Sequence, residues 1–143
     1  MIALPDVNVL LALAWQSHVH HDAAHAWFQQ AAGDGWATCL LTQSAFLRLS
    51  INPHVVHVAT DCIVARELLA DLTRHPHHRF LADSPPLTSD LFDPLAPKIH
   101  GYGQMTDATL LFFARVSDVK LVTFDQSVAA LSPWPDRIEI LKG

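Results

Sequence analysis

The stretch Ile2-Ala3-Leu4-Pro5-Asp6 runs directly into an apolar segment from Val7 to Trp15, and this junction decides the fold. Residues 2–5 are typical of a short buried strand, and residues 7–15 are typical of a mostly apolar helix. The same junction recurs near the C-terminus, where a strand over 120–124 is followed by Asp125 and a short helix over 126–131. Such alternation predicts an α/β fold with a mostly parallel sheet between layers of helices.

The rest of the chain continues this alternation. We expect further strands over residues 36–40, 79–82 and 138–141, and therefore a three-layer α/β/α domain over 1–143 with a sheet of about four to five strands. Further helices are expected over 21–32, from a Thr42 cap to just before Asn52-Pro53, over 59–74 and over 107–117. Residues 84–106 contain four prolines and two glycines and are expected to form a long loop.

The composition narrows the class of protein. Half of the 143 residues are hydrophobic, which argues against disorder. The net charge of −5 argues against a protein that coats nucleic acid through a broad basic surface, but an enzyme that holds a few phosphates through a metal is compatible with it. No apolar run is long enough to span a membrane and no basic segment precedes the first run, so we expect a soluble, cytoplasmic protein. Cys39 and Cys62 lie in apolar stretches and are expected to be reduced core residues.

Three aspartates lie at junctions between a predicted strand and a predicted helix. Asp6 and Asp125 each follow a strand, and Asp107 opens a helix. In an open α/β sheet, such junctions gather along the carboxyl edge of the strands, where ligands bind. Clustered carboxylates are suitable ligands for a hard divalent cation such as Mg²⁺. The pattern therefore predicts metal-dependent phosphodiester chemistry.

The acidic and histidine residues also have purely structural interpretations. Asp6, Asp107 and Asp125 each occupy a position where a short carboxylate caps a helix. The remaining candidates are expected to be turn residues, one of which could supplement a metal pocket; they are Asp83, Asp90 and Asp93. His21 and His25 have the spacing of two metal ligands on one helix face, but no third ligand is evident, and we interpret them as a solvated helix start.

Three segments resemble the best-marked segments of the PIN-domain ribonucleases. They are Asp6-Val7-Asn8-Val9-Leu10-Leu11, Gly101-Tyr102-Gly103-Gln104-Met105-Thr106-Asp107-Ala108 and Leu121-Val122-Thr123-Phe124-Asp125. Their order and spacing, together with the length of the chain, are similar to those of the VapC toxins of bacterial toxin–antitoxin pairs. The resemblance covers almost the whole chain. It implies a PIN-like fold and an acidic pocket that holds Mg²⁺ or Mn²⁺ and hydrolyses RNA.

The resemblance also assigns roles to individual positions. It implies that Asp6, Asp107 and Asp125 are catalytic residues that hold the metal, and that Asn8 and Thr123 are polar neighbours that orient the ligands or the phosphate. The family usually has a glutamate at the start of the third helix, where this chain has Gln43. A neutral amide attracts a cation less strongly than a carboxylate does. The hypothesis is therefore weakened metal affinity with activity retained.

The partners implied by the resemblance are an RNA substrate, with tRNA among the candidates, and a cognate antitoxin protein that inhibits the enzyme. A homodimer or a toxin–antitoxin hetero-oligomer is expected, and no membrane. Two alternatives remain open. Gln43 is compatible with a catalytically weakened PIN-like module that mainly binds a partner or RNA. Asp6-Val7-Asn8 is similar to the Asp-x-Asp start of the haloacid dehalogenase phosphatases, but its last residue is Asn and no lysine motif is evident.

Overall fold

Five short strands form one sheet in the order β3-β2-β1-β4-β5, and every neighbouring pair is parallel. The computed structural model describes residues 1–143. The strands are β1 (Ala3–Pro5), β2 (Trp36–Cys39), β3 (His78–Leu81), β4 (Lys120–Thr123) and β5 (Ile138–Ile140). The predicted α/β class and strand number are confirmed. Because all strands run the same way, their carboxyl ends lie along one edge of the sheet.

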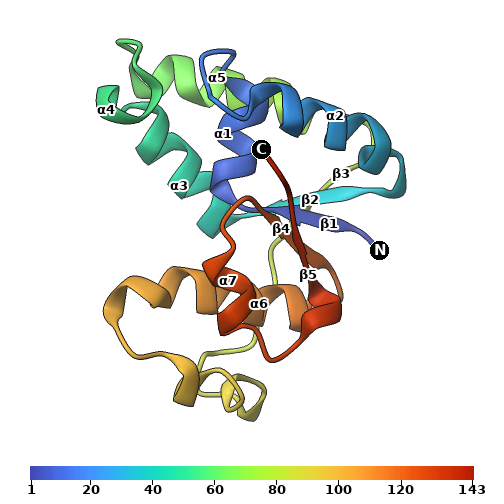
Figure 1. Cartoon of the computed structure of the whole chain (residues 1–143). Helices are drawn as coiled ribbons and strands as arrows, with labels where there is room; N and C mark the ends of the chain where they lie inside the picture. The colour runs from blue at the N-terminus through green and yellow to red at the C-terminus, as the bar shows by residue number, and fades with distance from the viewer.

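Helices cover both faces of this sheet (Figure 1). One layer consists of α1 (Val7–Ala14), α2 (His21–Ala31), α3 (Leu40–Ser50), α4 (Pro53–Val56) and α5 (Cys62–Thr73). The opposite layer consists of α6 (Met105–Val116) and α7 (Ser127–Leu131). Short 3-10 helices join these elements: η1 (Ala32–Asp34), η2 (Asp90–Phe92), η3 (Ala96–Lys98), η4 (Tyr102–Gln104) and η5 (Pro135–Arg137). None of the helices combines the length and the apolar character that a bilayer span requires.

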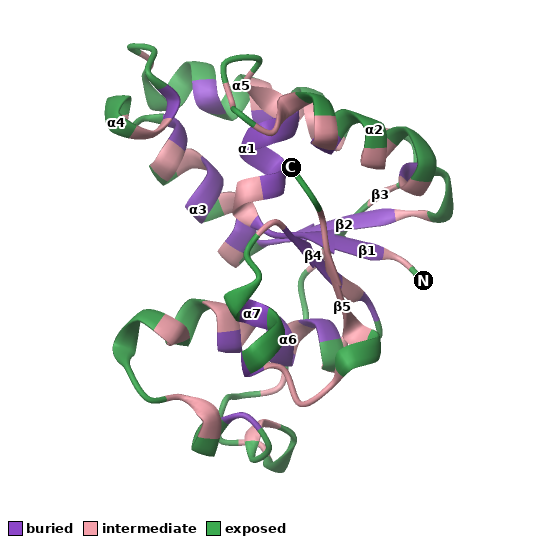
Figure 2. Cartoon of the chain, viewed as in Figure 1, coloured by how far each residue is buried: buried purple, intermediate pink, exposed green.

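The hydrophobic core is split by the sheet into two regions. On the α6 side, Leu4 and Leu121 pack with Leu111 and Phe112, and all four side chains are almost completely buried. On the α1 side, Trp36 and Phe46 pack with residues of the other helical layer. Figure 2 shows the central strands and α1 as the most continuously buried elements. The burial of both faces explains why the strands appear in the sequence as continuous apolar runs rather than alternating ones.

Several predicted boundaries differ from the structure. The third helix begins at Leu40, because Cys39 is the capping residue and the Thr42 hydroxyl accepts a hydrogen bond from the Cys39 N–H at 3.1 Å. The fourth predicted helix begins at Cys62 rather than Ala59, because the Asp61 carboxylate caps its first turn by accepting from the Val64 N–H. The short helix α4 was not predicted. The proline-rich segment 84–106 is not structureless, since it contains η2, η3 and η4.

Two predictions about single residue types need correction. Cys39 is buried as expected, but Cys62 is exposed at the start of α5, although both thiols are free. His21 and His25 are not simply a solvated helix start. Their rings lie within hydrogen-bond distance of the Ala12 and Leu13 carbonyl oxygens, at 2.7 and 3.1 Å, and they therefore satisfy the last turn of α1.

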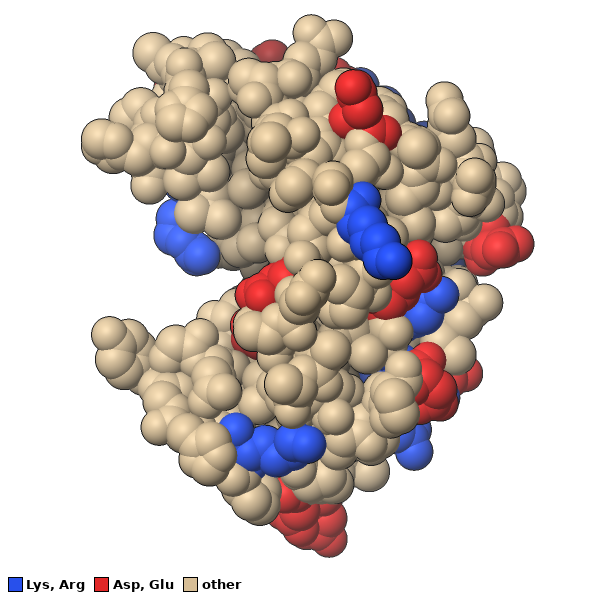
Figure 3. All heavy atoms as spheres, in the orientation of Figure 1, with Lys and Arg blue, Asp and Glu red and all other residues tan.

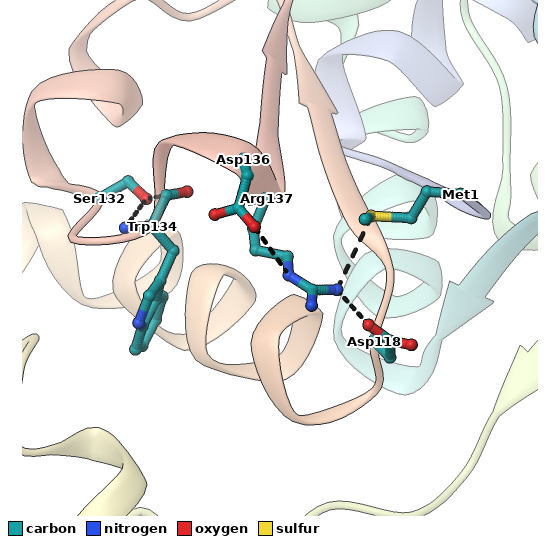
Figure 4. Close-up of polar contacts among 6 residues, drawn as sticks. All are labelled: Met1, Asp118, Ser132, Trp134, Asp136 and Arg137. Carbon is teal, nitrogen blue, oxygen red and sulfur yellow. Dashed lines mark hydrogen bonds and ion pairs between the residues drawn. The ribbon is translucent and has the colours of Figure 1, made fainter.

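A cluster around Arg137 holds the C-terminal edge strand in place (Figure 4). The Arg137 guanidinium, whose side chain is only 15% exposed, forms ion pairs with Asp118 in the turn before β4 and with Asp136. It also lies 3.7 Å from the Met1 sulfur. Lys120 and Glu139 form a further ion pair across β4 and β5 at 2.6 Å. These contacts fix β5 beside β4 at the amino end of the sheet, opposite the edge at which the candidate site lies.

Candidate functional site

Asp6 occupies the junction between β1 and α1 and is almost completely buried. As the N-cap of α1 it accepts a hydrogen bond from the Val7 N–H to Oδ1 at 2.7 Å. Its second oxygen, Oδ2, accepts a hydrogen bond from the Thr123 hydroxyl at 2.8 Å. Helix capping is therefore one role of Asp6. The contact with Thr123 adds a link to β4 that capping does not require.

The Thr123 hydroxyl is the centre of a network that joins β1 and β4. Besides donating to Asp6, it accepts hydrogen bonds from the Asn8 side-chain amide at 3.0 Å and from the Asp125 N–H at 3.1 Å. The Asn8 carbonyl oxygen in turn accepts from the Phe124 N–H at 3.2 Å. One donor and two acceptor positions exhaust what a hydroxyl offers. Asn8 and Thr123 therefore fix the position of the Asp6 carboxylate and of the Asp125 backbone.

Asp107 and Asp125 lie at the same edge of the sheet. Asp107 does not open α6, which begins two residues earlier, but lies in its first turn and is half-buried. Asp125 is exposed, and its Oδ1 accepts hydrogen bonds from the Ser127 N–H and hydroxyl at 2.9 and 2.7 Å. Asp125 is not the capping residue of α7, which is Gln126, but its carboxylate accepts hydrogen bonds from Ser127, the first residue of that helix.

Electrostatic coupling shows that the three aspartates form one group. Burial, followed by the negative charges of Asp6 and Asp125, raises the pKa of Asp107 to about 6. Burial also raises the pKa of Asp6, partly offset by the hydrogen bonds from Thr123 and Val7, and the charge of Asp125 raises it further. Carboxylates that raise one another's pKa are typical of sites that bind cations or perform acid–base chemistry.

The side of the site next to β2 is neutral, and its hydrogen bonds extend through Thr38 to His78 at the amino end of β3. Gln43, in the first turn of α3, donates a hydrogen bond from its amide to the Thr38 hydroxyl at 2.9 Å. The same hydroxyl lies 2.8 Å from Nε2 of His78. Burial and the neighbouring His75 lower the pKa of His78, which favours the neutral imidazole. With Nε2 as an acceptor, Thr38 donates to His78 and accepts from Gln43.

Sequence reasoning identified Gln43 but not Thr38 or His78. A signal was present, because Thr38 lies near the carboxyl end of β2 just as Thr123 lies at the carboxyl end of β4. The turn candidates did not join the group. Asp83, Asp90 and Asp93 are exposed, and the charges that raise the pKa values of Asp6 and Asp107 come only from within the trio.

The donor types fit a hard divalent cation, but the side chains are not closed around one. No group of three or more His, Cys, Asp or Glu residues is arranged to hold a metal ion. Both Asp6 oxygens and Oδ1 of Asp125 instead accept hydrogen bonds from protein donors. Asp125 is exposed, so its side chain can rotate away from Ser127 at little cost in packing. The mutual repulsion of the carboxylates favours any cation that enters among them.

The surface is hollowed between the two helical layers (Figure 3). Figure 3 shows this hollow opening on one side of the molecule, with acidic atoms at its inner end and a basic side chain at its upper rim. Such a shape offers an extended ligand access to the acidic group from one side. The carboxyl edge of a parallel sheet is also where ligands bind in this class of fold.

Comparisons with known proteins identify the family of the chain. A family model for the PIN domain matches residues 3–132. Ribonuclease VapC38 of Mycobacterium tuberculosis (strain ATCC 25618 / H37Rv) is 48% identical over 131 residues, which cover 92% of this chain and 90% of that protein. Ribonuclease VapC39 of the same strain is 40% identical over 130 residues, which cover 90% of this chain and 92% of that protein.

A solved structure is similar in fold. It is the crystal structure of VapBC2 from Rickettsia felis bound to a DNA fragment from their promoter, with a TM-score of 0.72. The match covers 99% of this chain and 100% of that chain at 13% sequence identity. At that identity the likeness concerns the fold alone.

Proposed function

Because the chain belongs to the PIN-domain family, and within it to the VapC group, we propose that it is a metal-dependent endoribonuclease that acts as the toxin of a toxin–antitoxin pair. The observation that carries the proposal is the coupled trio Asp6, Asp107 and Asp125 at the carboxyl edge of the sheet. The family model matches residues 3–132, a range that includes all three aspartates, and the relatives named as ribonucleases match over about nine-tenths of both chains.

In the proposed site, Asp6, Asp107 and Asp125 hold Mg²⁺ or Mn²⁺. When bound, such an ion lowers the pKa of a coordinated water and stabilises negative charge on the scissile phosphate. Thr123 and Asn8 hold Asp6 and the backbone at Asp125 in fixed positions, so that the site loses little entropy when a cation enters. Burial and the charges of Asp6 and Asp125 raise the pKa of Asp107 to about 6, which makes it a carboxylate suited to accept a proton from the attacking water.

Gln43 contributes a neutral oxygen in place of the carboxylate usual in the family. Its amide nitrogen is held by Thr38, which directs its carbonyl oxygen away from that contact. We propose reduced metal affinity rather than loss of activity. The substrate is RNA, with tRNA among the candidates, and the partner is a cytoplasmic antitoxin protein. The toxin works as a homodimer or within a toxin–antitoxin hetero-oligomer.

The test is cleavage of a labelled RNA by the purified protein with Mg²⁺, with Mn²⁺ and with EDTA. We expect cleavage by the wild type that EDTA abolishes and that Asp6→Asn and Asp107→Asn each abolish. Asp83→Asn, which removes an exposed aspartate outside the trio, is the matched control and should cleave normally. Cleavage that survives both trio substitutions would contradict the assignment.

The weakened binding module is a distinct outcome of the same experiment. It predicts RNA or partner binding by the wild type without metal-dependent cleavage at any metal concentration. This alternative is consistent with the structure, in which no three His, Cys, Asp or Glu side chains are arranged to hold a metal ion. Gln43→Glu separates the two, because recovery of cleavage in that variant alone would identify the neutral residue as the cause.

A further inference from the structure

A second hollow adjoins the acidic site and differs from it in charge. It has a volume of about 310 Å³ and lies between the segment before α6 and the start of α7. Its polar lining comes from Lys98, His100, Gln104 and Ser127. No aspartate or glutamate lines it, although the chain has 14 acidic residues and only 9 Lys and Arg. The volume is at the lower end of the range for small-ligand sites, roughly 300–1,000 Å³.

The hollow is close to the trio through both of its walls. Ser127, on the α7 wall, donates two hydrogen bonds to the Asp125 carboxylate. Gln104, on the other wall, immediately precedes α6, whose first turn carries Asp107. Both walls of the hollow are therefore joined directly to members of the trio.

The basic wall is held rigidly. The Gln104 side-chain oxygen accepts hydrogen bonds from the His100 and Gly101 N–H groups at 2.7 and 3.2 Å, which ties this segment to the start of α6. Ile99, between Lys98 and His100, packs against the core, and Leu95 just before them is completely buried. The neighbours of Ile99 therefore have fixed positions beside the hollow.

Lys98 is available for a ligand. It is half-buried and forms no ion pair, whereas Lys120, Arg74 and Arg137 are each paired with an acid. A lysine with no acidic neighbour in its hollow attracts an anion, and the phosphates of an RNA strand supply one. The negative trio next to it cannot itself hold RNA without a cation, so a separate positive contact is useful to the proposed enzyme.

We propose that this hollow is a phosphate subsite that holds the RNA backbone beside the cleavage point, with Lys98 as its charged contact and the His100 ring and the Gln104 amide nitrogen as hydrogen-bond donors. The proposal rests on the proposed ribonuclease function and adds the place where the strand is held. Phosphate contacts position a nucleic acid without reading its sequence. Lys98 is accordingly a binding residue and plays no role in the chemical step.

The test measures binding of a fluorescein-labelled single-stranded RNA in EDTA, where no cleavage occurs, over a series of salt concentrations. For Lys98→Gln we expect weaker binding and a slope of log affinity against log salt that is lower by about 0.7, the value for one lost phosphate contact with a single strand. Lys98→Arg should retain the wild-type slope. In the cleavage assay, Lys98→Gln should raise KM and leave kcat nearly unchanged.

The matched control is Arg79→Gln. Arg79 is exposed, forms no ion pair and lies on β3 beside a hollow lined by Ile2 and Gly35 at the amino end of the sheet. The Arg79→Gln substitution therefore removes the same charge as Lys98→Gln, but from the opposite edge of the sheet. Equal losses in Lys98→Gln and Arg79→Gln, or an unchanged slope in Lys98→Gln, would overturn the subsite while wild-type cleavage still supported the ribonuclease. Failure of the wild type both to bind and to cleave RNA would instead overturn the two proposals together.

Discussion

The two sides of the candidate site are built from the same kind of residue but carry different charge. On the β1–β4 side, Thr123 links to the carboxylate of Asp6 and to the backbone of Asp125. On the β2–β3 side, Thr38 is bound to a neutral amide and a neutral imidazole, those of Gln43 and His78. A threonine near the end of a parallel strand thus organises each side. Negative charge, and with it the expected chemistry, is therefore concentrated on the β1–β4 side of the site.

The largest effect is expected from Asp6, because it belongs to the charged side and is buried. Asp6→Asn keeps the size of the side chain but removes the charge, and we expect cleavage to fall by more than about 100-fold, beyond the loss for an outer-shell partner. Initial rates of RNA cleavage measure this. Gln43→Ala, a change on the neutral side, should lower the cleavage rate far less. Equal losses in the two variants would show that the two sides do not differ in their contribution to cleavage.

The next effect concerns the two threonines. Thr123→Val leaves the shape almost unchanged but removes three hydrogen bonds, and it deprives a buried carboxylate oxygen of its donor. We expect roughly 10- to 100-fold slower cleavage and a loss of about 1–3 kcal/mol in the free energy of unfolding. Urea denaturation and cleavage rates give the two values. Thr38→Val is the counterpart on the neutral side, and a larger effect there would reverse the assignment of the two sides.

The raised pKa of Asp107 predicts opposite effects on stability and activity. Its pKa of about 6 in the folded protein exceeds the ordinary value of 3.8, so this group stabilises the fold below pH 4, and that contribution is lost as the pH rises through 6. Asp107→Asn should therefore raise the stability at pH 7.5 by about 1 kcal/mol, a figure reduced for solvent screening. The gain should vanish near pH 4. In the wild type, cleavage should decline below pH 6 as Asp107 takes up a proton.

Thermal unfolding of wild type and Asp107→Asn at both pH values checks the stability prediction. Asp93→Asn, at an exposed turn position, controls for the loss of a single negative charge. If both variants gain equally at pH 7.5, the stabilisation comes from the lower overall negative charge rather than from the trio.

The smallest effect is expected from adding charge to the neutral side. Gln43→Glu should tighten Mn²⁺ binding by about two- to fivefold, the factor for a solvent-screened charge pair worth roughly 0.4–1 kcal/mol. Calorimetric titration with Mn²⁺ measures it. The new carboxylate cannot donate to Thr38 as the Gln43 amide does, so Gln43→Met is a suitable control for the loss of that hydrogen bond. Affinity equal to that of the wild type would show that this position does not face the cation.

The sequence was sufficient to predict the class of fold and the edge of the sheet at which the three aspartates lie, whereas their role as metal ligands stays a prediction. Strand–Asp–helix junctions are local patterns, and parallel strands bring their carboxyl ends together whatever the loops do. The first residues of the helices were less predictable. The residue that caps α3 is Cys39 rather than the expected Thr42, and α5 is capped by Asp61, two residues after the expected start at Ala59. These caps depend on side-chain hydrogen bonds that composition does not reveal.

The contacts within the site were the least predictable feature. Thr38 and His78 are 40 residues apart, and nothing in the local sequence of either indicates that they meet. The engagement of Asp125 by Ser127 is local, yet it bears on the metal because it turns one ligand toward α7. Hydrogen-bond partners across strands depend on register, which requires the assembled sheet.

The short hydrogen-bonded ladder between β1 and β2 has a consequence for where the sheet opens. Only one pair of residues, Ala3 and Trp36, is in register there, whereas β1 and β4 share three pairs and β2 and β3 share four. The shortest ladder in the sheet therefore lies between the acidic and the neutral halves. Slow hydrogen–deuterium exchange should persist within each half. The first breathing motion of the molecule should separate the two halves, widening the entrance for a strand of RNA without unfolding either.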